Sequence, residues 1–141
     1  MNSQTRKVDM EALRLISLFE KVTSANVKDY VMFKGKPTFI VEEGQLWKAL
    51  GKNRANLLKL ERLLDQRIKI VEYKSDKLQF IANLLYPLKI VDMEEDENGV
   101  VTIKGPDTKT KGLMIGAKAQ NLRALEGVVR MYFDCEEIKI I

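Results

Sequence analysis

The feature that most restricts the fold of this chain is a sequence pattern that occurs twice. The two copies are Leu50-Gly51-x4-Asn56-Leu57-x2-Leu60-Glu61 and Ile115-Gly116-x4-Asn121-Leu122-x2-Leu125-Glu126. A second pair of similar segments follows them, Arg67-Ile68-Lys69-Ile70 and Glu137-Ile138-Lys139-Ile140. In a chain of 141 residues this repeat predicts two structural units, residues 8–74 and 75–141. Each unit is near the size at which a single hydrophobic core becomes marginal.

Both halves of the chain predict the same order of elements. In the first half, apolar spacing predicts helices over 9–22, 45–50 and 56–64, and β-branched or aromatic runs predict strands over 27–33, 38–41 and 68–71. The second half predicts helices over 76–85, 112–115 and 121–132 and strands over 89–93, 100–104 and 137–141. Asp9 and Asp76 are the expected N-caps of the first helix in each half. The fold class is therefore α+β, with the order α-β-β-α-α-β occurring twice.

The composition excludes most catalytic schemes. The chain has no histidine, which rules out Ser-His-Asp and Cys-His catalysis, and its single cysteine rules out intramolecular disulfides and CxxC metal clusters. No apolar run reaches the roughly 18 residues that a membrane helix needs. The N-terminal residues also lack the apolar segment of a signal peptide. We therefore expect a cytoplasmic protein. Carboxylates, lysines or a bound Mg²⁺ could still support chemistry, but we expect a monomer that is not an enzyme and holds no metal or other cofactor.

Positive charge is concentrated in the first half of the chain. Residues 1–74 carry a net charge of +6 and residues 75–141 a net charge of −2. Between residues 48 and 69 there are seven Lys or Arg and two acidic residues. Such an asymmetry points to a region that faces a polyanion, although a solvated surface would have the same composition.

Two α-β-β-α-α-β units, each with a glycine loop between the second and third helix, resemble tandem type II KH domains. The chain as a whole resembles archaeal NusA-like transcription elongation and termination factors, and the residues that carry this resemblance are 50–57, 70–73, 80–87 and 111–122. The resemblance implies three-stranded mixed sheets with helices on one face. It also implies a factor in transcription elongation, termination or antitermination, with single-stranded nascent RNA and RNA polymerase as partners.

The glycine loops are the expected sites of RNA contact. KH domains hold about four single-stranded nucleotides with a GxxG loop against the sugar-phosphate backbone. Here the second glycine is replaced by Arg54 in the first loop and by Ala119 in the second. Arg54 could reach a phosphate with two hydrogen bonds, or it could block the close approach of the strand. A left-handed backbone at Ala119 would cost about 1–2 kcal/mol relative to glycine.

We expect the RNA-binding residues to lie in these loops and beside them. In the first unit they are Lys48, Gly51, Lys52, Asn53, Arg54 and Lys59. In the second unit they are Lys111, Gly116, Ala117, Lys118, Ala119 and Arg123. The alternative for the cationic side chains is an ordinary solvated helix face, and the adjacent loop favours phosphate contact.

Several nearby residues have a structural interpretation. Asn56 and Asn121 begin their predicted helices, which favours a role as N-caps. Trp47 could stack on a base, but its place between Leu46 and Leu50 favours packing in the core. Tyr86 is expected in a core or an interface. The acidic neighbours of the lone cysteine predict an unreactive thiol.

Three classes of function follow from these patterns. The first is an RNA-binding transcription factor that grips single-stranded RNA with two KH loops. The second is a KH-fold docking module that binds little RNA and contacts RNA polymerase or ribosomal proteins, which the replaced loop glycines favour. The third is a small metal-dependent enzyme, for which the sequence offers only Glu42, Glu43 and the acidic residues at 94–97.

Overall fold

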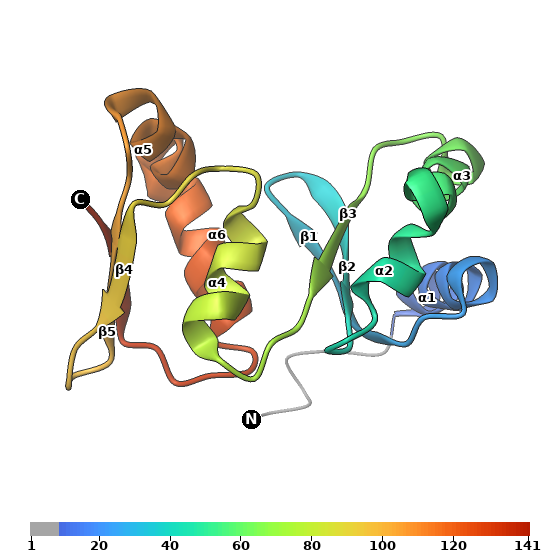
Figure 1. The fold of residues 1–141 in the computed structure, drawn as a ribbon, viewed down its shortest axis with the longest axis horizontal. Helices are drawn as coiled ribbons and strands as arrows, with labels where there is room; N and C mark the ends of the chain where they lie inside the picture. The colour runs from blue at the N-terminus through green and yellow to red at the C-terminus, as the bar shows by residue number, and fades with distance from the viewer. Residues whose placement is uncertain (1–8) are drawn as a thin grey trace. The chain divides into compact units, whose positions relative to one another are not determined.

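Residues 9–74 fold as one unit around a three-stranded sheet (Figure 1). The computed structural model describes residues 9–141, so the predicted domain start at residue 8 lies outside the described residues. The elements in chain order are α1 (Met10–Thr23), β1 (Val27–Phe33), β2 (Lys36–Val41), α2 (Leu46–Leu50), the 3-10 turn η2 (Lys52–Arg54), α3 (Ala55–Leu64) and β3 (Lys69–Glu72).

Residues from Ser75 onward form a second unit with the same order of elements. They are α4 (Lys77–Leu85), β4 (Asp92–Glu95), β5 (Val100–Lys104), α5 (Thr108–Ile115), the 3-10 turn η3 (Ala117–Ala119), α6 (Gln120–Val129) and β6 (Glu137–Ile140).

The predicted bounds of two elements in the second unit are wrong. The strand predicted at 89–93 begins at Asp92 and continues to Glu95, because two acidic residues extend the pairing with β5. The helix predicted at 112–115 begins four residues earlier, because the side chain of Asp107 caps it by accepting from Thr110 N at 2.7 Å. Gly112 therefore lies inside α5.

Both sheets are mixed and have the same topology. Strands β1 and β2 are antiparallel and β2 and β3 are parallel, and the pairs β4–β5 and β5–β6 repeat this arrangement. The middle strand of each sheet is therefore the second strand of its unit. Figure 1 shows α1, α2 and α3 on one side of the first sheet and α4 and α6 beside the second. The chain is α+β with mixed three-stranded sheets.

Each unit has its own apolar core. In the first, the rings of Phe19 and Phe39 stack with their centroids 4.5 Å apart, among buried residues that include Val41, Ala49 and Leu60. In the second, the rings of Phe80 and Tyr132 pack in a T-shaped arrangement with their centroids 5.5 Å apart. The buried apolar residues around it include Ile81, Leu84, Val101, Ile103, Leu125 and Ile138.

The N-caps predicted for the first helix of each half are confirmed. Asp9 accepts from Glu11 N at 3.0 Å, and Asp76 accepts from Leu78 N at 3.0 Å and from Gln79 N at 3.3 Å. These bonds satisfy amides that a helix start leaves without intrahelical acceptors. None of the helices in residues 9–141 is long and apolar enough to cross a membrane.

Candidate nucleic-acid interface

Each unit carries the same loop between its second and third helices. Helix α2 ends at Gly51, whose amide donates to the carbonyl oxygen of Trp47 at 2.9 Å. Helix α5 ends at Gly116, whose amide donates to the carbonyl oxygen of Gly112 at 2.8 Å. Both glycines have a φ of 76°, with ψ values of 169° and 172°, a combination that only glycine adopts readily. The two loops therefore leave their helices along the same path.

A side-chain hydrogen bond closes each loop. Asn56 Nδ2 donates to the carbonyl oxygen of Lys48, and Asn121 Nδ2 donates to that of Leu113, both at 3.1 Å. The interpretation of these asparagines as N-caps is wrong. Each is the second residue of its helix, and its side chain reaches back to the preceding helix across the loop.

The closing asparagine explains why a glycine must precede it by five positions. A Cβ added to Gly51 would lie 2.8 Å from Asn56 Cγ, and one added to Gly116 would lie 2.7 Å from Asn121 Cγ. Contacts this short do not occur without displacement of one group. The repeated Gly-x4-Asn pattern is therefore the sequence signature of this loop.

The two residues before each third helix are left-handed. In the first loop, φ is 55° at Asn53 and 61° at Arg54, and in the second it is 54° at Lys118 and 61° at Ala119. The left-handed conformation costs about 1–2 kcal/mol at each of Arg54, Lys118 and Ala119, whereas asparagine tolerates it better. The loop thus keeps its shape in both units although its second glycine is absent, and the rest of the fold compensates for the strain.

The cationic residues of the first loop are exposed. The side chains of Lys48, Lys52, Arg54 and Lys59 all face solvent. Within residues 9–141, none of these four forms an ion pair. Their charges are therefore available to an anionic ligand that approaches the start of α3.

The second loop has fewer available cations. Lys118 is exposed, but the residues beside it are Ala117 and Ala119. Lys111 is half-buried, with its side-chain carbons over Gly105. Arg123 is exposed, but one of its guanidinium NH groups is bonded to a carboxylate, unlike the lysines of the first loop.

A buried glutamate holds that arginine. One NH group of Arg123 donates to Glu126 Oε1 at 2.7 Å, and this hydrogen bond and the charge of Glu126 raise the pKa of the guanidinium. The carboxyl group of Glu126 also accepts from Ile138 N at 2.8 Å, although the residue is only 2% exposed. Local sequence patterns do not reveal this role, and the signal for it is the glutamate that ends both copies of the repeat.

The first unit has the equivalent helix-to-strand contact. Glu61 Oε2 accepts from Ile68 N at 3.0 Å, as Glu126 does from Ile138 N. Each glutamate ties its third helix to the chain at or just before the last strand of its unit. The two contacts help to fix the helices whose first turns adjoin the loops.

Trp47 does not pack in the core, and the prediction that it does is wrong. Its side chain is 80% exposed, because the short α2 buries only Ala49 against the sheet and α3. Tyr86, 64% exposed, does not belong to the core of its unit either. The sequence pattern failed here because a helix of five residues does not produce a reliable apolar periodicity.

A second group of lysines lies at one end of the first sheet. Lys34 and Lys36 flank the β1–β2 turn, and β3 begins at Lys69, which pairs with Thr38. Burial, followed by the charges of Lys34 and Lys36, lowers the pKa of Lys69 to about 8. The corresponding β4–β5 turn of the second unit is acidic.

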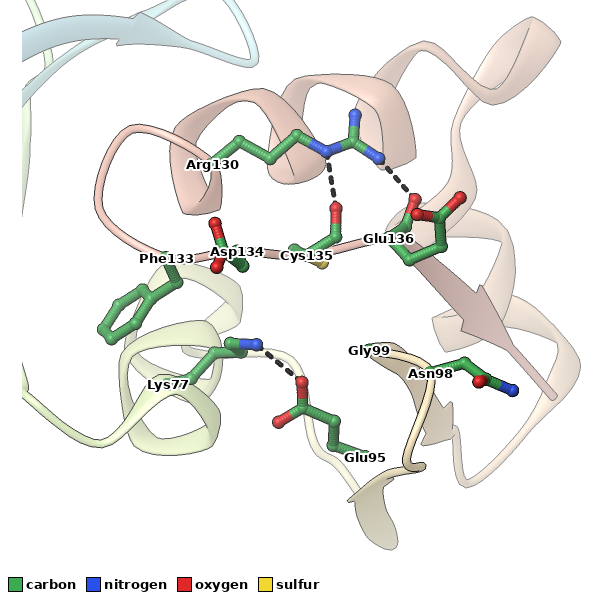
Figure 2. A pocket seen from close by; sticks show the side chains of 9 residues that line it. All are labelled: Lys77, Glu95, Asn98, Gly99, Arg130, Phe133, Asp134, Cys135 and Glu136. Carbon is green, nitrogen blue, oxygen red and sulfur yellow. Dashed lines mark hydrogen bonds and ion pairs between the residues drawn. The ribbon is translucent and has the colours of Figure 1, made fainter. Parts of the chain in front are cut away.

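The second unit also has a hollow whose polar groups bond to one another (Figure 2). Arg130 Nε donates to the carbonyl oxygen of Cys135 at 2.8 Å, and another NH group donates to that of Glu136 at 2.7 Å. Lys77 Nζ lies 2.6 Å from Glu95 Oε2. Burial raises the pKa of the Cys135 thiol, which opposes thiolate formation. The two Arg130 bonds connect the end of α6 to the segment just before β6, and the ion pair connects α4 to β4.

Acidic residues do not gather into a metal site in the described part of the chain. Across residues 9–141, no three His, Cys, Asp or Glu side chains are placed to hold a metal ion. Glu95, one of the acidic residues considered for cation binding, instead forms the ion pair with Lys77.

Comparison with known proteins gives a consistent result. The probable transcription termination protein NusA of Methanococcus vannielii is 29% identical over 137 residues, which is 96% of this chain and 79% of that protein. The protein of the same name from Halococcus morrhuae is 28% identical over 130 residues, which is 92% of this chain and 94% of that protein. This chain is therefore NusA-like, because it is similar to these archaeal proteins over nearly its whole length. No protein-family model matches the NusA-like chain.

The fold of the NusA-like chain also occurs in a solved structure. The crystal structure of APE1850 superimposes with a TM-score of 0.68 at 28% sequence identity, and it covers 95% of this chain and 100% of that one. The sequence similarity to the Methanococcus protein extends over 137 of 141 residues. The likeness therefore includes both units of the NusA-like chain.

Proposed function

We propose that this NusA-like chain is a non-enzymatic transcription factor that acts in elongation, termination or antitermination. Its two units are tandem type II KH domains, and both loops grip single-stranded RNA. Nascent transcript is the ligand and RNA polymerase the assembly in which the factor works. Its archaeal relatives are named probable transcription termination proteins, which supports the transcription role.

One observation carries the RNA-binding part of the proposal. The first loop presents exposed, unpaired Lys48, Lys52 and Arg54 beside the start of α3, within residues 9–141. The N-terminus of a helix favours anions through its free amides and its dipole. Cationic side chains at the same point add charge-assisted hydrogen bonds to phosphate oxygens. The combination suits the backbone of a flexible strand better than it suits a compact anion.

The salt dependence of binding tests this proposal. If about three phosphates are neutralised, the logarithm of the binding constant falls with the logarithm of salt concentration at a slope of about −2 for a single strand. The measurement is fluorescence anisotropy of a labelled single-stranded RNA at several salt concentrations. We expect Lys52→Glu with Arg54→Glu to flatten the slope and weaken binding.

A control of equal charge separates loop contact from general attraction. Lys89→Glu with Lys139→Glu removes the same net charge at two exposed positions outside the loops. We expect this variant to keep most of the slope. Equal losses in both double variants would mean that the first loop has no special contact with RNA.

A second function is favoured by the left-handed Arg54 and Ala119, where a KH loop of the usual pattern would have glycine. In this case the chain is a docking module that contacts RNA polymerase or ribosomal proteins and binds little RNA. Recovery of purified polymerase after nuclease treatment, together with no RNA affinity in the titration, would favour docking over RNA binding.

A further inference from the structure

The first loop has an exposed aromatic residue directly beside it. Trp47 is the only tryptophan of the chain, and its side chain is 80% exposed. It lies one helical turn before the loop, because the amide that ends α2 at Gly51 donates to its carbonyl oxygen. An indole at this place lies next to the RNA sugar-phosphate backbone that the loop is proposed to hold.

The fold does not need an aromatic side chain at this position. In the second unit, the residue whose carbonyl accepts the corresponding amide, from Gly116, is Gly112. The loop that follows has the same dihedral angles within a few degrees. The exposed aromatic surface of Trp47 is therefore not required for the conformation of the loop.

The positive charges around Trp47 indicate which class of ligand it contacts. Lys48 follows Trp47 directly, and Lys52 and Arg54 follow within the loop, all exposed. An aromatic face among cations suits a polyanion with flat apolar groups, because stacking on the bases and phosphate contact can occur together. A protein partner of ordinary composition would leave these charges buried and unpaired.

We propose that Trp47 stacks on a base of the single-stranded RNA whose phosphates contact Lys52 and Arg54. The inference rests on the proposed RNA binding and makes it more specific. It assigns the first loop a base contact that the second loop lacks. Stacking tolerates any base, so the contact increases affinity without requiring one sequence.

The fluorescence of the single tryptophan reports this contact directly. The probes are an oligouridine RNA of about eight nucleotides and an abasic ribose-phosphate oligomer of the same length. We expect the oligouridine to quench Trp47 fluorescence with the same saturation curve that anisotropy gives for binding. The abasic oligomer should bind through its phosphates with little quenching.

Variants separate stacking from charge. Trp47→Ala should weaken oligouridine binding by about 5- to 150-fold and leave the salt slope unchanged, since no charge is lost. Trp47→Phe should retain most of the affinity because it keeps an aromatic face. Tyr86→Ala, which removes another exposed aromatic ring, is the matched control and should have no effect.

The outcomes distinguish this inference from the function on which it rests. RNA binding with the expected salt slope, but with no quenching and no loss in Trp47→Ala, would overturn stacking and leave the proposed function intact. Absence of RNA binding by the unmodified chain would overturn both. Unchanged RNA affinity in Trp47→Ala with loss of binding to purified polymerase would make Trp47 a protein contact and contradict the proposal.

Discussion

The two loops have the same backbone conformation but present different side chains. Gly51 and Gly116 have the same φ, and the asparagine five residues later makes the same hydrogen bond at the same 3.1 Å. Between these fixed points the first loop has Lys-Asn-Arg-Ala and the second Ala-Lys-Ala-Gln. The shape therefore depends on glycine and asparagine, and the residues between them are free to determine what the loop binds.

The two units also differ outside their loops. The first unit has lysines at its β1–β2 turn and an exposed tryptophan on α2, whereas the second has acidic residues at its β4–β5 turn and a glycine on α5. The arginine beside the second loop is paired with a buried glutamate. We infer that the first unit provides most of the charge for RNA and the second provides a weaker contact.

The largest loss of stability is expected at the two loop glycines. It tests whether the same steric contact with asparagine fixes the backbone conformation of both loops. Gly51→Ala and Gly116→Ala should each destabilise the protein by about 2–4 kcal/mol, because the added Cβ meets the asparagine and the backbone conformation is strained. Urea unfolding followed by circular dichroism measures the change.

Gly112→Ala is the control for this pair, because it lies in α5 only four residues from Gly116 and a Cβ there meets nothing within 4 Å. It should stabilise the protein by up to about 1 kcal/mol, as alanine does in a helix interior. A tolerated Gly51→Ala or Gly116→Ala would contradict the steric account of that loop.

The asparagine hydrogen bonds should contribute equally. Asn56→Ala and Asn121→Ala each remove one bond to a backbone carbonyl and should destabilise by about 1 kcal/mol. Because Asn56 is what a Cβ at position 51 meets, Gly51→Ala with Asn56→Ala should cost less than the sum of the two changes. Strict additivity in a double-mutant cycle would show that the two residues do not interact.

Restoring the second glycine distinguishes the two possible roles of Arg54. Arg54→Gly and Ala119→Gly should each stabilise the chain by about 0.5–1 kcal/mol, because relief of the left-handed conformation exceeds the added freedom of the unfolded chain. If Arg54 contacts phosphate, Arg54→Gly weakens RNA binding and Ala119→Gly does not. Tighter binding by Arg54→Gly would mean that the arginine obstructs the strand.

The smallest expected effect concerns the lysines at the first sheet. The pKa of Lys69 is lowered to about 8, first by burial and then by Lys34 and Lys36. Between about pH 8 and the ordinary lysine pKa, the unfolded state binds more protons, so this group makes the protein more stable as pH rises. Lys36→Gln should raise the pKa, measured from the side-chain NMR signal of Lys69. An unchanged value would show that Lys36 does not contribute.

The repeat was enough to predict the order of elements, and local patterns could not predict the details of the loops. Asp9 and Asp76 were recognisable as N-caps because capping is local. The role of Asn56 depends on a carbonyl eight residues earlier in the preceding helix, which a local pattern does not reveal. The exposure of Trp47 depends on how little of α2 meets the core. The pairing of Arg123 was missed because it depends on a buried glutamate.

The same loop occurs twice, and we infer that the first copy makes the stronger contact with RNA. The most direct test is an NMR titration with a short single-stranded RNA that follows the backbone amides of residues 51–54 and 116–119 in one sample. We expect both sets of signals to shift, with those of the first loop responding at the lower RNA concentration. Shifts confined to residues outside both loops, or a stronger response at 116–119, would contradict this account.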